Sequence, residues 1–117
     1  MFTDGNLTIM VSDFERSLRF YTETLGLALK FRAGNEWAEV AAPGVSIGLH
    51  PAGGHAPTGA GGGMSLGLQV SDIESAIETL KGRGVEFPRG WRASGQLRMA
   101  DFADPDGTQL YLFQNAA

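Results

Sequence analysis

The sequence predicts an α+β fold built from two tandem βαβββ modules, with the helices packed on one face of the strands. Three observations predict it: a tripeptide that occurs twice, a turn-and-strand pattern that occurs twice, and a strand followed by a helix at the start of each half. A chain of 117 residues has the usual length of one domain, so we expect a single domain over residues 1–117.

The repeat is visible near both ends of the module. Val11-Ser12-Asp13 returns as Val70-Ser71-Asp72, and the pattern of residues 43–49 returns in residues 106–112. Two matches in the same order favour an internal repeat over chance similarity. The predicted parts are module one at about 5–50, a glycine-rich linker at 51–63 and module two at about 64–115. The glycines and prolines of the linker predict a flexible connection.

Each module is expected to begin with a strand and a helix. Apolar and polar residues alternate over residues 6–11 and again over 65–70, which is the period of a half-buried strand. The pattern S-x-x-E follows at residues 12–15 and 71–74 and is typical of a helix start, with the serine as the cap. Glycines at Gly26 and Gly84 suit the ends of these helices, where a positive φ is needed.

Three strands complete each module. We expect them at about 28–33, 36–42 and 45–50 in the first module and at about 85–88, 96–103 and 108–114 in the second. Hairpin turns separate the strands, at 42–44 in the first module and at Asp104-Pro105-Asp106-Gly107 in the second. We assign Asp104 and Asp106 to the geometry of that turn, and Phe20-Tyr21 to helix packing.

Composition excludes several classes of function. Nine Lys and Arg against thirteen Asp and Glu give a net charge of −4 with no basic stripe, so we expect no nucleic-acid partner. The absence of cysteine excludes disulfides, thiolate metal sites and cysteine nucleophiles. The sequence shows no signal peptide and no apolar run of membrane-spanning length, so we expect a soluble cytoplasmic protein with no membrane partner.

One face of the four strands that open and close the modules carries an unusual set of residues. It combines small, polar and a few large side chains, with no Lys, Arg, Asp or Glu. Its members are Asn6, Thr8, Met10, Ser46, Gly48, His50, Ser65, Gly67, Gln69, Gln109, Tyr111 and Phe113. A solvated sheet face is the alternative, but such a face usually carries several charges. We therefore favour a ligand pocket.

Several motifs together resemble those of a known family. They are V-S-D followed by F-Y-x-x-x-L-G-L over residues 20–27, the second V-S-D, and the late F-A-D-P-D-G over residues 102–107. Over nearly its whole length the chain thus resembles the vicinal oxygen chelate superfamily, which includes glyoxalase I, extradiol dioxygenases, fosfomycin-resistance enzymes and bleomycin-resistance proteins. The resemblance implies paired modules around a central cavity and a homodimer.

The resemblance also implies where a metal would bind. Metal enzymes of this superfamily place their ligands at four equivalent strand positions, which correspond here to Asn6, Gly48, Ser65 and Tyr111. None of these is His, Asp or Glu, and a divalent metal needs about three strong donors. The sequence therefore favours the metal-free, drug-binding branch of the superfamily, with no cofactor and no assigned catalytic residue.

The candidate ligand-binding residues are aromatic, hydrogen-bonding or charged. They are Asn6, Trp37, Glu39, His50, Trp91, Arg98 and Tyr111. Core packing is the alternative for both tryptophans, and a surface ion pair with Asp101 or Glu86 is the alternative for Arg98. We expect an uncharged-to-cationic, partly aromatic small molecule, and the favoured role is sequestration of an antibiotic or toxic metabolite.

Two other functions stay open at this point. A displaced metal site that includes His50, with Glu39 and one further group, would make the protein a metal-dependent lyase or dioxygenase. The protein could instead serve in assembly, with a cavity filled by its own side chains.

Overall fold

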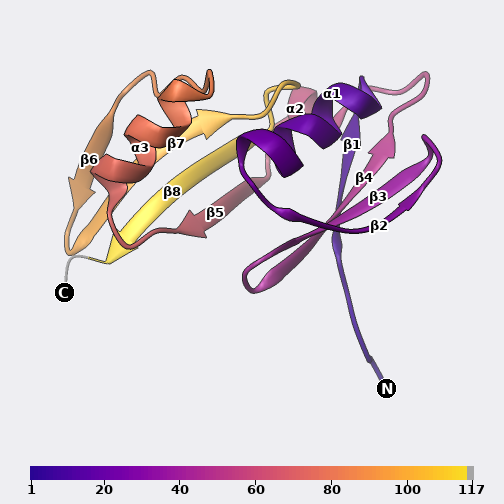
Figure 1. The fold of residues 1–117 in the computed structure, drawn as a ribbon, viewed down its shortest axis with the longest axis horizontal. Helices are drawn as coiled ribbons and strands as arrows, with labels where there is room; N and C mark the ends of the chain where they lie inside the picture. Colours follow the sequence, from indigo (N-terminus) through magenta and orange to yellow (C-terminus); the bar gives the residue numbers. More distant parts are fainter. Residues whose placement is uncertain (116–117) are drawn as a thin grey trace.

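The computed structural model describes residues 1–115 and confirms the predicted α+β class with its tandem βαβββ modules (Figure 1). The elements are β1 (Leu7–Val11), α1 (Phe14–Arg19), the π-helical turn η1 (Phe20–Thr24), β2 (Ala28–Ala33), β3 (Trp37–Ala42), β4 (Val45–Pro51), α2 (Thr58–Gly61), β5 (Ser65–Gln69), α3 (Ile73–Gly82), β6 (Trp91–Ser94), β7 (Leu97–Ala103) and β8 (Gln109–Asn115). Over this described range, no helix is long and apolar enough to cross a membrane.

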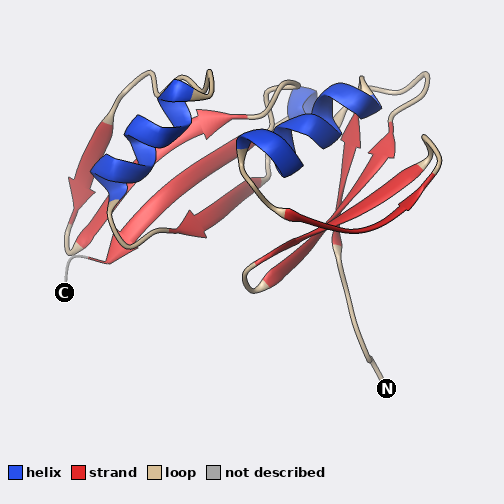
Figure 2. Ribbon diagram, in the orientation of Figure 1, coloured by secondary structure: helices blue, strands red, loops and turns tan. Residues whose placement is uncertain are grey.

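The strands form two four-stranded sheets that follow the same plan. Their orders are β1-β4-β3-β2 and β5-β8-β7-β6. In each sheet the first strand of the module runs parallel to the last, and the remaining neighbours are antiparallel. The sheets lie side by side, and α1 and α3 cover the same side of both (Figures 1 and 2). The sheet faces opposite these helices, here called the open face, are left uncovered by them.

The core lies between each helix and its sheet. Alternate strand residues face the helices because side chains of a strand point to opposite sides. The buried residues include Ile9, Val11, Phe14, Leu18, Tyr21, Val40, Ile47 and Leu49 in the first module and Leu66, Ile73, Ile77, Leu80, Ala100, Phe102, Leu110 and Leu112 in the second. Each large apolar side chain buried in this way contributes about 1.5–3 kcal/mol.

The helix starts differ from the prediction by one residue. The N-caps are Asp13 and Asp72, whose Oδ1 atoms accept from the backbone N–H of Arg16 at 3.1 Å and of Ser75 at 3.2 Å. The prediction of a serine cap is therefore wrong in both modules, and in the first Ser12 donates to the distant Asp106 carboxylate instead. Both glycines at the predicted helix ends do have a positive φ, 75° and 92°.

The strand predicted at residues 85–88 is wrong, and the corresponding strand is β6. Val85 and Phe87 are buried within an irregular segment, and the ring of Phe87 lies 5.3 Å from that of Phe102. The alternating apolar pattern there reflects a loop packed into the core. Pro88 further disfavours a strand because it has no N–H to donate.

The predicted flexible linker is packed between the modules. Thr58 Oγ1 of α2 accepts a hydrogen bond from the N–H of Met10 in β1 at 2.8 Å. Gly59 lies so close to the turn before β8 that an added Cβ would come within 2.6 Å of Thr108 N. The part of the linker around α2 thus contacts both modules.

The turn before β8 also joins the modules. Asp104 is buried and accepts from the Tyr21 hydroxyl at 2.7 Å, while Asp106 accepts from the N–H of Ser12 at 3.0 Å and from its hydroxyl. Arg16 lies 3.2 Å from the Asp106 carboxylate. Burial, and next the Asp104 carboxylate, raise the pKa of Tyr21 far above its usual range. The two acids thus do more than shape their own turn.

Candidate functional site

The open face carries the residues that alternation places there. In the first sheet Thr8 lies beside Gly48 and Met10 beside His50, and in the second Gly67 lies beside Tyr111. These neighbours alternate with the buried residues of the same strands. The register therefore confirms which side chains share the open face.

In the first sheet the indole of Trp37 lies across Gly48. A Cβ added to Gly48 would come within 2.8 Å of Trp37 Cζ2, so only glycine allows the ring to approach the neighbouring strand this closely. Trp37 remains partly exposed while Gly48 is buried. The ring therefore forms an aromatic surface that lies against the sheet.

The second sheet has the same arrangement with a different ring. Tyr111 lies across Gly67, where an added Cβ would come within 2.7 Å of Tyr111 Cε2. The ring of Phe113 follows at 5.9 Å between centroids. Both sheets thus present a partly exposed aromatic ring that lies against a glycine of the neighbouring strand.

Glu39 lies beside Trp37 on the same face of β3, with its side chain 20% exposed. Its Oε2 accepts from the Ser46 hydroxyl at 2.6 Å and lies 3.0 Å from Lys30 Nζ. The Ser46 hydrogen bond, and next the hydrogen bond from Lys30, hold the pKa of Glu39 below its usual value. The hydrogen bond to Glu39 raises the pKa of Lys30 in return.

Ser46→Ala should raise the pKa of Glu39 toward its ordinary value, because the largest stabilising contact of the carboxylate is lost. Because its pKa is lowered in the folded protein, the Glu39 carboxylate contributes to folding stability at pH values above its ordinary pKa. This contribution is lost as the pH falls through the lowered pKa. The carboxyl carbon shift of Glu39, followed by NMR against pH, measures the change. Thr8→Ala is the control, because it removes a hydroxyl of the same face that donates to Asn6 and not to Glu39. If both variants change the pKa of Glu39 equally, the Ser46 hydrogen bond is not what lowers it.

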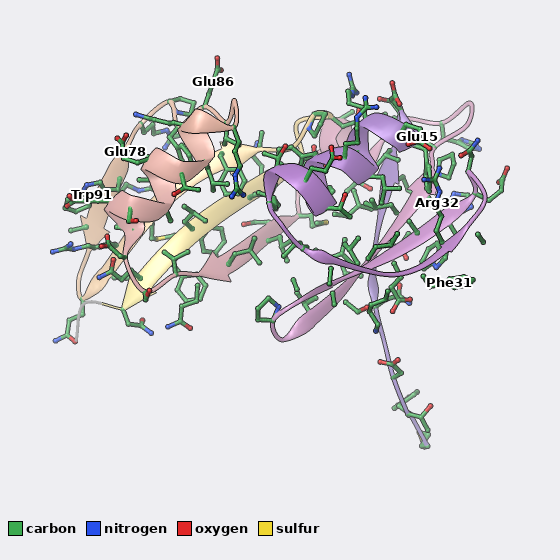
Figure 3. All side chains as sticks on the ribbon, in the orientation of Figure 1. Glu15, Phe31, Arg32, Glu78, Glu86 and Trp91 are labelled. Atoms are coloured by element: carbon green, nitrogen blue, oxygen red, sulfur yellow. The ribbon has the colours of Figure 1, made fainter. Side chains whose placement is uncertain are left out.

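Trp91 and Arg98 lie on the opposite side of the second sheet. Trp91 is the strand neighbour of Ala100, which is fully buried on the helix-bearing face, and Arg98 is two residues from Ala100 on the same strand. The guanidinium of Arg98 lies 4.9 Å from the centroid of the Trp91 ring. Figure 3 shows Trp91 at the α3 side of the molecule, far from Phe31. The structure therefore does not bring these two together with Trp37 and Glu39.

Two expectations about this pair also change. Trp91 begins β6 and is 40% exposed, so it is not part of the core. Asp101 is paired with Arg92, at 2.8 Å, where the sequence suggested Arg98 as its partner.

A family model described as the Glyoxalase/Bleomycin resistance protein/Dioxygenase superfamily matches residues 5–112. The chain belongs to this superfamily. The resemblance that the motifs predicted is thereby confirmed. A comparison with curated proteins gives no significant match.

Solved structures of the superfamily resemble the whole chain. TnmS3, an antibiotic binding protein from Streptomyces sp. CB03234, is 30% identical, with 98% of each chain covered and a TM-score of 0.80. A superfamily member from Sphaerobacter thermophilus is also 30% identical, with 98% of each chain covered and a TM-score of 0.78. A third, from Nocardioides, is 26% identical over 98% of this chain and 84% of its own, with a TM-score of 0.80.

The metal positions implied by the superfamily do not fit a divalent ion here. Gly48 has no donor and is covered by Trp37, and the Tyr111 ring lies against Gly67. Asn6 Oδ1 accepts from the Thr8 hydroxyl at 3.0 Å. Ser65 offers only a neutral hydroxyl, which is a weak ligand.

His50 is exposed, and its Nδ1 donates to the Pro51 carbonyl at 2.7 Å. It neighbours Met10, whereas Glu39 neighbours Gly48 two residues earlier along β4. Among residues 1–115, no three His, Asp or Glu side chains gather closely enough to hold a metal ion. The described part of the chain thus supplies no third group for a displaced site around His50.

Phe31 is a residue of the open face that the sequence did not indicate. It neighbours Glu39 across β2 and β3 and is 58% exposed. A register shift between Leu29 and Phe31 changes which side chains of β2 face the helices. Because alternation cannot show such a shift, no local signal in the sequence could have placed Phe31.

Two hollows of similar volume lie near the second sheet. One of about 490 Å³ is lined by Phe20, residues 84–86, Pro88 and Arg89, together with the turn before β8. Another, of about 500 Å³, runs along the edge strand β5 between α3 and residues 25–27. It shares Gly67, Gln69 and Phe113 with the open face. A ligand on the open face therefore has room to extend around the edge of the second sheet.

Proposed function

We propose that the protein binds a partly aromatic, uncharged-to-cationic small molecule on the open face without a metal ion, and that it sequesters an antibiotic or toxic metabolite. The observation that carries this proposal is the pair of aromatic rings lying against glycines, Trp37 on Gly48 and Tyr111 on Gly67. One ring covers Gly48 and the other belongs to Tyr111, and these are two of the four positions at which the resemblance places metal ligands. Partly exposed rings backed by a sheet suit stacking, which adds about 0.5–1.5 kcal/mol per aromatic pair beyond burial.

The polar groups of the same face support recognition of a specific molecule. Asn6, Glu39, Gln69 and the Tyr111 hydroxyl offer donors and acceptors around the rings. Such a mixture of aromatic surface and few polar groups is typical of ligand pockets. The likeness to TnmS3, an antibiotic binding protein, supports the same class of ligand.

A second copy of the chain would complete the site in this proposal. The open face is uncovered in one chain, and Phe31 is 58% exposed there. Small-molecule sites usually bury about 70–90% or more of the surface of a drug-sized ligand. One open sheet covers only one side of such a ligand and cannot bury this much of its surface. We therefore include a homodimer in the proposal, in which the open faces of two copies enclose the ligand.

A thermal-shift screen of aromatic antibiotics tests this function. A ligand at a hundred times its dissociation constant should add about 2.7 kcal/mol to the free energy of unfolding, a shift of several degrees. Trp37→Ala should abolish the shift, whereas Trp91→Ala, which alters the opposite side, should preserve it. Added Zn²⁺, Mn²⁺, Fe²⁺, Ni²⁺ or Mg²⁺ should produce none.

Sedimentation velocity should show a dimer at the concentrations of the screen.

Stoichiometric metal that survives dialysis and disappears in His50→Ala would contradict the metal-free proposal and favour an enzyme with a displaced site. Ligands that bind Trp37→Ala as well as wild type would contradict the open face as the site.

A further inference from the structure

We propose that Glu39 and Trp37 form a subsite for the ammonium group of an aromatic amine, and that Lys30 occupies this subsite in the free protein. The inference rests on the proposed function and names the chemistry of its ligand. It concerns three residues of adjoining strands: Lys30 on β2 and Glu39 and Trp37 on β3.

Glu39 and Trp37 share one face of β3. Trp37 and Glu39 are two residues apart on one strand, so their side chains point to the same face. Gly48, which the Trp37 ring covers, is the strand neighbour of Glu39 on β4. Phe31 is its neighbour on β2. Glu39 thus has an aromatic residue on each side of it.

The carboxylate of Glu39 and the aromatic residues beside it favour binding of a cation over binding of a neutral group. Aromatic faces attract ammonium and guanidinium groups, and a carboxylate makes its strongest hydrogen bonds with charged donors. Both protein partners of Glu39, Ser46 and Lys30, use Oε2. The second oxygen, Oε1, is therefore the acceptor that a further donor would use.

Lys30 can leave the carboxylate at little cost. Its side chain is 43% exposed and lies on the edge strand β2, at the register shift between Leu29 and Phe31. Ion pairs this exposed contribute little to stability, because water screens them and the long side chain must be held in place. When Lys30 swings into solvent, the half-buried carboxylate needs a new positive partner. The ammonium group of a ligand whose ring stacks on Trp37 supplies it.

Two probes with the same ring system test the subsite: 9-(aminomethyl)anthracene, which carries an ammonium group, and 9-(hydroxymethyl)anthracene, which carries a hydroxyl. Their dissociation constants are measured by probe fluorescence anisotropy near neutral pH. We expect the amine to bind wild type at least about tenfold more tightly than the alcohol. Glu39→Gln should abolish this difference, because it should weaken the binding of the amine far more than that of the alcohol.

Lys30→Met removes the competing cation and keeps the length of the side chain. It should tighten binding of the amine several-fold with no change for the alcohol. Trp37→Ala should weaken both probes, because both stack on the indole. Circular dichroism and the unfolding temperature confirm that each variant is folded.

The outcomes separate the subsite from the function on which it rests. Equal binding of both probes, or a preference for the amine that persists in Glu39→Gln, overturns the subsite and leaves the proposed function standing. Unchanged amine binding in Lys30→Met overturns the role of Lys30. If neither probe binds wild type, the aromatic surface does not bind ligands, and the proposed function fails together with the subsite.

Discussion

Asp104→Ala should lower the free energy of unfolding by about 3–5 kcal/mol, the larger of two effects expected at the module junction. The Asp104 carboxylate is buried and accepts three hydrogen bonds: from the Tyr21 hydroxyl at 2.7 Å, the Asp106 N–H at 2.9 Å and the Thr108 N–H at 2.8 Å. Alanine would leave these donors without their partner. Urea unfolding measures the loss, and the unfolding temperature should fall by more than about 10 °C.

Two variants show whether this loss comes from the buried network. Asp101→Ala removes a carboxylate whose ion pair with Arg92 is partly exposed, and it should cost less than about 1 kcal/mol. Tyr21→Phe should destabilise wild type but have little effect in the Asp104→Ala background, because the hydroxyl has already lost its partner. Equal effects of Tyr21→Phe in both backgrounds would contradict the network.

Gly59→Ala should destabilise the protein by about 2–3 kcal/mol. An added Cβ would lie 2.6 Å from Thr108 N and 2.7 Å from the carbonyl carbon of Asp106. These are backbone atoms of the turn that accepts hydrogen bonds from the first module, so they cannot move aside as a flexible side chain would. The helix α2 would have to shift away from the turn, and this shift would disturb the hydrogen bond between Thr58 and Met10.

Gly61→Ala is the matched control in the same short helix. A Cβ at Gly61 would meet no atom within 4 Å. Alanine there should be neutral or stabilise slightly, because it reduces the freedom of the unfolded chain. Urea unfolding of the two variants compares them directly. If both change stability by the same amount, the segment around α2 is not packed against the second module.

The fold was largely predictable because its main signals are local. Alternation along β1, β4, β5 and β8 shows which face of each strand is buried, and the repeat shows that both modules share one plan. Contacts between distant residues were not predictable in this way. Ser12 does not cap its helix because Asp106, far along the chain, accepts from it. The segment at 85–88 is a loop because Phe87 packs on Phe102.

The site was predictable only in part. Trp37 and Glu39 share a face of β3, as their spacing indicates, and Lys30 and Phe31 join them only through the register shift in β2. Arg98 carries a signal that could have been used. It alternates with Ala100 and Phe102, both buried, and this pattern already indicates the helix-bearing face.

The indole ¹⁵N–¹H signals of the two tryptophans test the central proposal most directly. Trp37 lies on the open face and Trp91 on the opposite face, so the protein contains its own reference. Titration with 9-(aminomethyl)anthracene, with the signals assigned through Trp91→Phe, should move the Trp37 signal saturably and leave the Trp91 signal in place. If only the Trp91 signal moves, or if neither signal moves at a high probe concentration, ligand binding on the open face is contradicted.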